Sequence, residues 1–270
     1  MTTAAEAIVP HRRRLWLYAL AGLVMVFLIL PSVIVVPMSF SDSVSLEFPP
    51  RAWSLKWYRT YFGAVEWQDA TWVSVKTALL TVVLATPLGT AAAYGLHVSR
   101  LRLAGLIRVL LTLPLMVPVI LLGIGIFYVY ARLGLNYTIT GLVLAHTMLA
   151  LPFVAVTVAA GLMTYDMNQE MVARSLGAAR LRAFLLITLP QIRFSVISAA
   201  LFAFITSLDE VIVALFISGG ENATLTRRMF NALRDEVDPT IGAISTCLIV
   251  VSTLVVAVAQ LWGRRRAPGS

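Results

Sequence analysis

Two adjacent acidic residues, Asp209 and Glu210, interrupt an apolar run that extends from residue 194 to residue 220. A charged side chain at the centre of a bilayer costs about 2.5 to 3.5 kcal/mol even on insertion scales, so such groups face water, protein or a functional partner. Adjacent residues of a helix point about 100° apart, so we expect different roles for the two. Carboxylates beside a pathway suit a cationic solute; a structural ion pair or a helix-end group is the alternative.

No arrangement of residues typical of an enzyme accompanies this pair. The sequence has no Gly-x-x-x-x-Gly-Lys-Ser/Thr loop and no His-Glu-x-x-His motif, so the chain is not expected to hydrolyse ATP or to carry catalytic residues. Cys247 is the only cysteine, which excludes a disulfide framework and a cysteine metal site; no metal is expected. His146 is interpreted as a hydrogen-bonded interior histidine, and Tyr128 and Tyr130 as residues near an interface that could also cradle a cation.

A second feature is the polar stretch NQEMVARSLGAARLRAFLLITLPQIR, residues 168–193. Asn168 is a suitable N-cap for a helix over 168–176, Gly177 permits a turn, and a second helix is predicted over 179–188, before Pro190. The pattern alone is compatible with an amphipathic helix on anionic lipid, helped by its four arginines. It is also compatible with a docking surface.

The rest of the chain predicts an all-α polytopic membrane protein. Of its 270 residues, 59% are hydrophobic and 13% are charged, whereas a soluble domain has about half apolar and about a quarter charged residues. A helix needs about 20 apolar residues to cross a bilayer. Runs of this length predict six transmembrane helices, over 15–40, 77–99, 109–131, 133–165, 194–220 and 240–263.

Prolines and aromatic residues predict further details of these segments. Pro114 and Pro118, followed by two glycines, predict a bent or broken third helix, as found where a helix lines a cavity. Trp57, Tyr58 and Tyr61 predict a short interfacial helix in the segment 41–70. Another short helix is predicted within 219–239.

The basic residues indicate the orientation of the chain. With six spans and a cytoplasmic N-terminus, thirteen Lys or Arg residues fall inside and seven outside, which is the positive-inside bias of a membrane protein with both termini in the cytoplasm. A net charge of +8 distributed in this way does not predict nucleic-acid binding. The predicted organisation is a tail over 1–14, a transmembrane domain over 15–263 and a basic tail over 264–270.

Gly177, followed after nine residues by Ile187-Thr-Leu-Pro190, resembles the cytoplasmic signature loop of binding-protein-dependent ABC importer permeases. In that family the loop begins with Glu-Ala-Ala; here Ala173 matches the second alanine, Met171 stands at the glutamate position, and Glu170 is displaced by one residue. The resemblance implies a coupling loop over 166–190 that docks on the ATP-hydrolysing subunit. Its expected coupling residues are Glu170, Met171, Val172, Ala173, Arg174, Ser175, Leu176, Gly177, Ala178, Leu189 and Pro190.

Residues 207–246 are similar to the end of permeases of the spermidine/putrescine type, although Leu225-Thr226 stands where that group often has Leu-Pro. The resemblances imply the type I importer transmembrane fold in a bacterial inner membrane. They also imply half of a pathway completed by a second, sister permease. The other implied partners are an extracytoplasmic substrate-binding protein and two cytoplasmic ATP-binding subunits, which use the ATP and Mg²⁺, so that no cofactor is bound by this chain.

The function expected from these features is import of a small cation, a polyamine such as spermidine or putrescine, past Asp209 and Glu210. Another small solute is an alternative: an opine, a phosphonate or an amino-acid derivative. A gradient-driven secondary transporter using Asp209, Glu210 and His146 is a rival, although no internal repeat is evident. A non-transporting membrane subunit, with 168–193 as a docking surface only, is a second rival.

Overall fold

A computed structural model describes residues 15–99, 102–235 and 237–264, with side chains to residue 257. The predicted tail over 1–14 lies outside the described residues, as does the predicted tail over 264–270 except for Arg264, which is the last residue of the final helix. The described part is helical apart from turns and one isolated bridge between Ser41 and Trp53. The chain forms two compact units, one comprising residues 1–61 and 237–250 and the other residues 62–236 and 251–270.

In the first unit, aromatic residues of α2 (Lys56–Gly63) hold the segment that follows α1 (Leu15–Met38). The indole Nε1 of Trp57 donates to the carbonyl of Ser43 at 3.2 Å, and the hydroxyls of Tyr58 and Ser39 are hydrogen-bonded at 2.7 Å. Trp57 is buried, as is Tyr61. The short aromatic helix is therefore confirmed, with two of its rings packed inside the unit. The unit also contains the first part of α13 (Thr240–Arg264).

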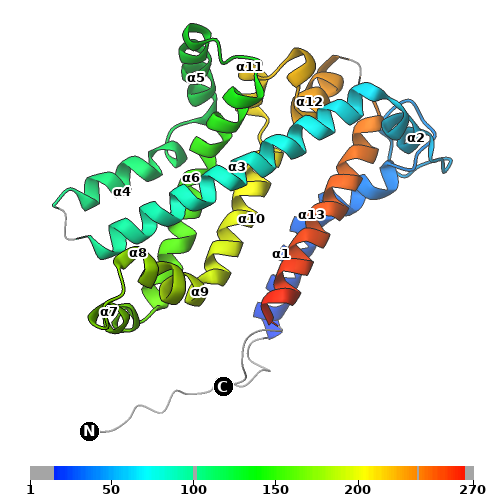
Figure 1. Cartoon of the computed structure of the whole chain (residues 1–270). Helices are drawn as coiled ribbons and strands as arrows, with labels where there is room; N and C mark the ends of the chain where they lie inside the picture. Colours follow the sequence, from blue (N-terminus) through cyan, green and yellow to red (C-terminus); the bar gives the residue numbers. More distant parts are fainter. Residues whose placement is uncertain (1–14, 100–101, 236, 265–270) are drawn as a thin grey trace. The chain divides into compact units, whose positions relative to one another are not determined.

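The second unit is built on three helices that pack side by side, α3 (Val65–Val98), α6 (Ile139–Thr164) and α10 (Arg193–Asp209) (Figure 1). Small residues let their backbones approach closely, as is typical of membrane bundles. The core is formed by Ala85, Ala93, Ala150, Val154, Val158, Leu162, Ile192, Ala199 and Ala203.

A polar cluster also joins these three helices. The ring Nδ1 of His146 on α6 lies 2.8 Å from the hydroxyl of Ser207 on α10, which in turn donates to Thr81 of α3 at 3.4 Å. His146 is buried, so its predicted role as a hydrogen-bonded interior residue is confirmed. In hydrocarbon such a cluster fixes the relative rotation of the helices, because its alternative is unpaired polar atoms.

The second transmembrane helix begins earlier in the chain than predicted. Helix α3 starts at Val65 rather than at residue 77, and so includes Glu66, Asp69 and Lys76. These charged residues are exposed and leave the backbone hydrogen bonds intact. A helix of 34 residues is longer than the roughly 20 residues needed to cross the hydrocarbon core. The apolar run therefore predicts the membrane-crossing part of the helix, but not where the helix begins.

Two other predicted spans are interrupted. The third consists of α4 (Ala104–Thr112), the turn η2 (Leu113–Leu115) and α5 (Val119–Leu133), bent by 98°, which confirms the predicted break. The fifth, predicted over 194–220, consists of α10 and α11 (Ile212–Ile217), separated at Glu210. Four described helices are long and apolar enough to cross a membrane. Up to six crossings result if each of two bent pairs forms one: Ala104–Leu115 with Val119–Leu133, and Arg180–Gln191 with Arg193–Asp209, which is bent by 81°.

The segment that follows the fifth span contains η4 (Gly220–Asn222) and α12 (Leu225–Asp235), which confirms the predicted short helix within 219–239. Ser74 of α3 accepts a hydrogen bond from the backbone N–H of Leu225 at 2.8 Å. Arg228 forms an ion pair with Glu66 at 2.7 Å. Helix α12 is thereby fixed to the beginning of α3.

Substitution of Gly89 tests the contact between α3 and α6. A Cβ atom there would lie 2.5 Å from Cγ1 of Val154, a side chain that has little freedom in a helix. We expect Gly89→Ala to destabilise the purified chain by about 1 to 3 kcal/mol, measured by thermal unfolding in detergent. Gly95→Ala on the same helix is the control, because nothing lies within 4 Å of its Cβ position. Equal melting of the two variants would contradict the close packing.

Candidate functional site

The loop over 166–190 begins with α7 (Asn168–Ser175), which ends in a turn at Gly177. The predicted N-cap, Asn168, is wrong: it is the first helical residue, and its N–H donates to the Asp166 carboxylate at 3.0 Å. Gly177 has a φ of +93°, a conformation that residues with a Cβ rarely adopt. Its N–H donates to the carbonyl of Arg174 at 3.0 Å, which closes the helix end.

The second helix of the loop was predicted to end before Pro190, but the helical structure continues through this residue. Helix α8 (Arg180–Ala183) continues as a π-helical turn, η3 (Phe184–Thr188), and then as α9 (Leu189–Gln191). The N–H of Leu189 donates to the carbonyl of Phe184, five residues earlier. The wider turn accommodates a proline at the start of α9, where its missing N–H removes no hydrogen bond.

Glu170 connects this loop to the helical bundle. Its side chain is 1% exposed. One carboxylate oxygen accepts from the hydroxyl of Tyr94 on α3, and the other from the hydroxyl of Thr188 on η3, both at 2.6 Å. Tyr94 also stacks on Phe184, with ring centroids 4.5 Å apart, and accepts from Nε of Arg180 at 3.5 Å. We call Tyr94, Glu170 and Thr188 the Glu170 cluster; it ties α7, α3 and η3 together.

The opposite face of α7 is apolar and exposed. Met171 is 55% exposed, Val172 59% and Leu176 84%. Val172, Leu176 and Ile187 are among the residues that line a shallow hollow of about 590 Å³. We call this surface the α7 hollow; its lining residues are Asp166, Asn168, Gln169, Val172, Ala173, Leu176 and Ile187.

The predicted coupling residues therefore fall into two groups. Glu170 alone points inward, because the shift by one position rotates its carboxylate about 100° away from the face that carries Met171. The remaining ten are exposed or half-buried along the loop: Met171, Val172, Ala173, Arg174, Ser175, Leu176, Gly177, Ala178, Leu189 and Pro190.

The acidic pair lies at the end of α10, and its two members differ as expected. Glu210 is in an extended conformation between α10 and α11, and its Oε1 accepts from the N–H of Val213 at 2.8 Å. Its carbonyl accepts from the hydroxyl of Thr226 at 2.9 Å. Glu210 thus caps the start of α11. Asp209 is exposed, and within the described residues it has no ion-pair partner.

This arrangement favours a cation near Asp209. The C-terminal end of a helix carries a partial negative charge of about half a unit, which adds to that of the carboxylate. Interrupted helices expose backbone oxygens in the same way at transporter cation sites. Among the described residues, no group of three or more His, Cys, Asp or Glu side chains is placed to hold a metal ion.

Sequence analysis missed two residues of the Glu170 cluster. Tyr94 is 76 residues from Glu170 along the chain, and Thr188 is 18 residues away. Tyr94 follows a run of alanines, and Thr188 lies inside the motif that ends at Pro190. Neither position forms a local pattern with Glu170, so only the packing of α3 against the loop shows their connection.

Comparison with known families and relatives agrees with these features. Residues 85–268 match the family described as "Binding-protein-dependent transport system inner membrane component". The spermidine/putrescine transport system permease protein PotC of Haemophilus influenzae is 30% identical, with 88% of this chain and 93% of the relative aligned. The putrescine transport system permease protein PotI of Escherichia coli K12 is 30% identical, with 89% of this chain and 88% of the relative aligned. The molybdenum transport system permease protein ModB of Mycobacterium bovis is 32% identical, with 89% of this chain and 91% of the relative aligned.

Solved structures with the same fold are also transporters. A bacterial alginate ABC transporter, crystallised with its pentasaccharide-bound periplasmic protein, superposes with a TM-score of 0.72 at 15% identity, covering 94% of this chain and 96% of that one. An amino acid ABC transporter superposes with a TM-score of 0.56 at 21% identity, covering 78% and 96%. These likenesses confirm the type I importer transmembrane fold.

Removal of the central carboxylate tests the Glu170 cluster. Glu170→Ala leaves two buried hydroxyls unpaired, which we expect to lower the free energy of local opening by about 2 kcal/mol. Amides of residues 168–176 should then exchange hydrogen roughly 30-fold faster, as measured by mass spectrometry. Gln169→Ala, at an exposed neighbour, is the control and should leave exchange unchanged. Unchanged protection in Glu170→Ala would show that the carboxylate does not hold the loop.

Proposed function

The chain belongs to the family of binding-protein-dependent transport system inner membrane components, and we propose that its solute is a polyamine such as spermidine or putrescine. As a member of this family it is a permease subunit of an ABC importer. Because the family works with a binding protein, the gradient-driven alternative loses its support. What has to be inferred is the solute, the partners and the orientation.

Asp209 is the observation that carries the polyamine proposal. It is an exposed carboxylate at the C-terminal end of α10, where the helix is interrupted, and Glu210 beside it is occupied in capping α11. A polyamine passing this point exchanges water for the carboxylate and for the carbonyl oxygens of the helix end. Each ammonium group then retains charge-assisted hydrogen bonds along its path.

The relatives support a cation more than an anion. Two of those described above are named for putrescine or for spermidine and putrescine, and one is named for molybdenum. An oxyanion needs clustered N–H or guanidinium donors, whereas the interruption after α10 presents a carboxylate. The geometry at Asp209 therefore favours the polyamine.

The α7 hollow is the proposed docking site of an ATPase subunit. Exposed apolar side chains such as Val172 and Leu176 are typical anchors for a groove in a partner protein. We assign ATP and Mg²⁺ to two such ATPases, and expect this chain to bind neither. The Glu170 cluster would then transmit movement of the docked loop to α3, since it fixes α7 to that helix.

Two further partners complete the proposed importer. Six spans form only half of a pathway, so a sister permease is expected to supply the other half. A substrate-binding protein delivers the solute on the opposite side from α7; support comes from the alginate transporter, which was crystallised with its periplasmic protein. The surplus of basic residues in the segments predicted to lie inside supports our proposal that the α7 loop and both termini are cytoplasmic.

Separate substitutions of the acidic pair test the solute. Asp209→Asn removes the charge near the pathway, so the KM for putrescine should rise roughly tenfold or more. Glu210→Gln keeps an oxygen that can accept from Val213, and its KM should stay within about threefold of wild type. The measurement is uptake of labelled putrescine by proteoliposomes that contain the assembled complex. Unaltered kinetics in Asp209→Asn, or no putrescine uptake by the wild-type complex, would refute the proposal.

A charge placed in the α7 hollow tests the docking site. Leu176→Asp should reduce the amount of ATPase that co-purifies with the tagged chain roughly tenfold, because a buried leucine contributes about 1.5 to 3 kcal/mol. Leu103→Asp, at another exposed leucine outside the hollow, is the control and should retain the ATPase. If both variants retained the ATPase, the docking surface would have to lie elsewhere.

A further inference from the structure

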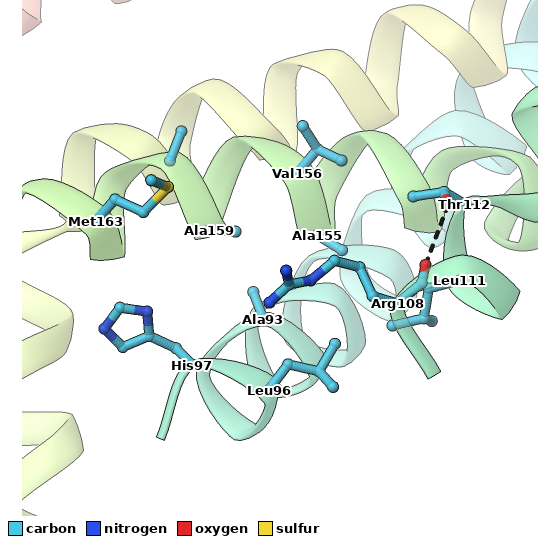
Figure 2. A pocket seen from close by; sticks show the side chains of 11 residues that line it. Ala93, Leu96, His97, Arg108, Leu111, Thr112, Ala155, Val156, Ala159 and Met163 are labelled. Carbon is cyan, nitrogen blue, oxygen red and sulfur yellow. Dashed lines mark hydrogen bonds between the residues drawn. The ribbon is translucent and has the colours of Figure 1, made fainter. Parts of the chain in front are cut away.

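A cavity of about 350 Å³ lies between α3, α4 and α6 in the second unit. Figure 2 shows the guanidinium of Arg108 directed into it, between Ala93 of α3 and the α6 residues Ala155 and Ala159. His97 stands at one end, one residue before the end of α3. The other lining residues are Leu96, Leu111, Thr112, Val156, Ala160 and Met163.

The lining is apolar except for three residues, and it contains no acidic residue. The hydroxyl of Thr112 is occupied, because it donates to the carbonyl of Arg108 at 3.1 Å. Arg108 and His97 remain as donors, and within the described residues neither forms a salt bridge. The small side chains of Ala93, Ala155, Ala159 and Ala160 leave the space open along α6.

Arg108 and His97 are both exposed, and their positive or donor groups beside an apolar surface favour an anion. A guanidinium that lies beside apolar side chains at the end of a membrane helix extends to the headgroups, where it pairs with acidic groups. No side chain of the lining supplies the negative charge. A polyamine is repelled by Arg108, so the cavity is not part of the polyamine path. The missing partner is therefore an anion that also has an apolar part to fill the space.

We propose that this cavity, the Arg108 pocket, binds an anionic phospholipid. Arg108 and His97 donate to the phosphate, and one acyl chain lies over Ala155, Ala159 and Ala160 in place of side chains. Basic pockets between membrane helices on the cytoplasmic side bind anionic lipid headgroups in this manner. The proposal rests on the chain being a membrane permease and on its proposed orientation, and it is independent of the polyamine assignment.

The test is native mass spectrometry of the purified complex in detergent, titrated with phosphatidylglycerol or phosphatidylcholine. We expect phosphatidylglycerol to bind in preference to phosphatidylcholine. Arg108→Gln should weaken that binding roughly tenfold or more, because a charge-assisted hydrogen bond to phosphate is lost. Ala160→Leu keeps the charge but fills the cavity, and should weaken binding as well. Loss of binding in both variants would show that charge and space are both required.

Arg102→Gln is the matched control, since Arg102 is exposed in the same segment but does not line the pocket. Equal weakening by Arg102→Gln and Arg108→Gln would mean general attraction to positive charge and would overturn the site. Unchanged binding in Arg108→Gln would do so too. Displacement of the lipid by 10 mM inorganic phosphate alone would identify a free-phosphate site instead. Because no solute is present, failure here leaves the uptake result untouched, and a lack of putrescine uptake leaves the lipid site standing.

Discussion

In hydrocarbon every backbone N–H and C=O group needs a partner, and this constraint decides where the helices of this permease can be interrupted. The interruption between α10 and α11 shows how it is met. The carboxylate of Glu210 accepts from the N–H of Val213, and the hydroxyl of Thr226 donates to the carbonyl of Glu210. Side chains thus replace the helical hydrogen bonds at the point where Asp209 is exposed. An acidic pair here serves two purposes, since one member maintains the irregular backbone that presents the other.

The same principle operates in the loop over 166–190. A buried carboxylate is stable only with its oxygens paired, and Glu170 obtains both partners from other elements, Tyr94 on α3 and Thr188 on η3. Because Glu170 is fixed inward, Met171 and Leu176 are held outward. The apolar surface offered to the proposed ATPase therefore depends on an internal hydrogen-bonded cluster. That cluster also makes a direct connection from the loop to the helical bundle.

Charge separates the functions proposed for the membrane-embedded part. Asp209 lies at the end of α10 and favours cations, whereas Arg108 and His97 lie beside the far end of α3 and favour anions. A polyamine and an anionic lipid are therefore not expected to compete for either position. Arg108 is one of the basic residues that form the surplus on the proposed cytoplasmic side. Lipid binding there would help to fix the depth of α3 and α6 in the bilayer.

Apolar runs by themselves determined that the chain is a helical membrane protein, and the glycine and proline spacing from Gly177 to Pro190 pointed to the permease family. These features are local, since run length and turn chemistry depend on neighbours in the sequence. Local signals failed where distant residues decided the outcome: α3 begins before its apolar run, and a π-helical turn carries the chain through Pro190. The inward direction of Glu170 follows from Tyr94 and Thr188, 76 and 18 residues away, in elements that only tertiary packing brings together. The different roles of Asp209 and Glu210 could be expected from their sequence positions, and Glu210 caps α11 through Val213, three residues away.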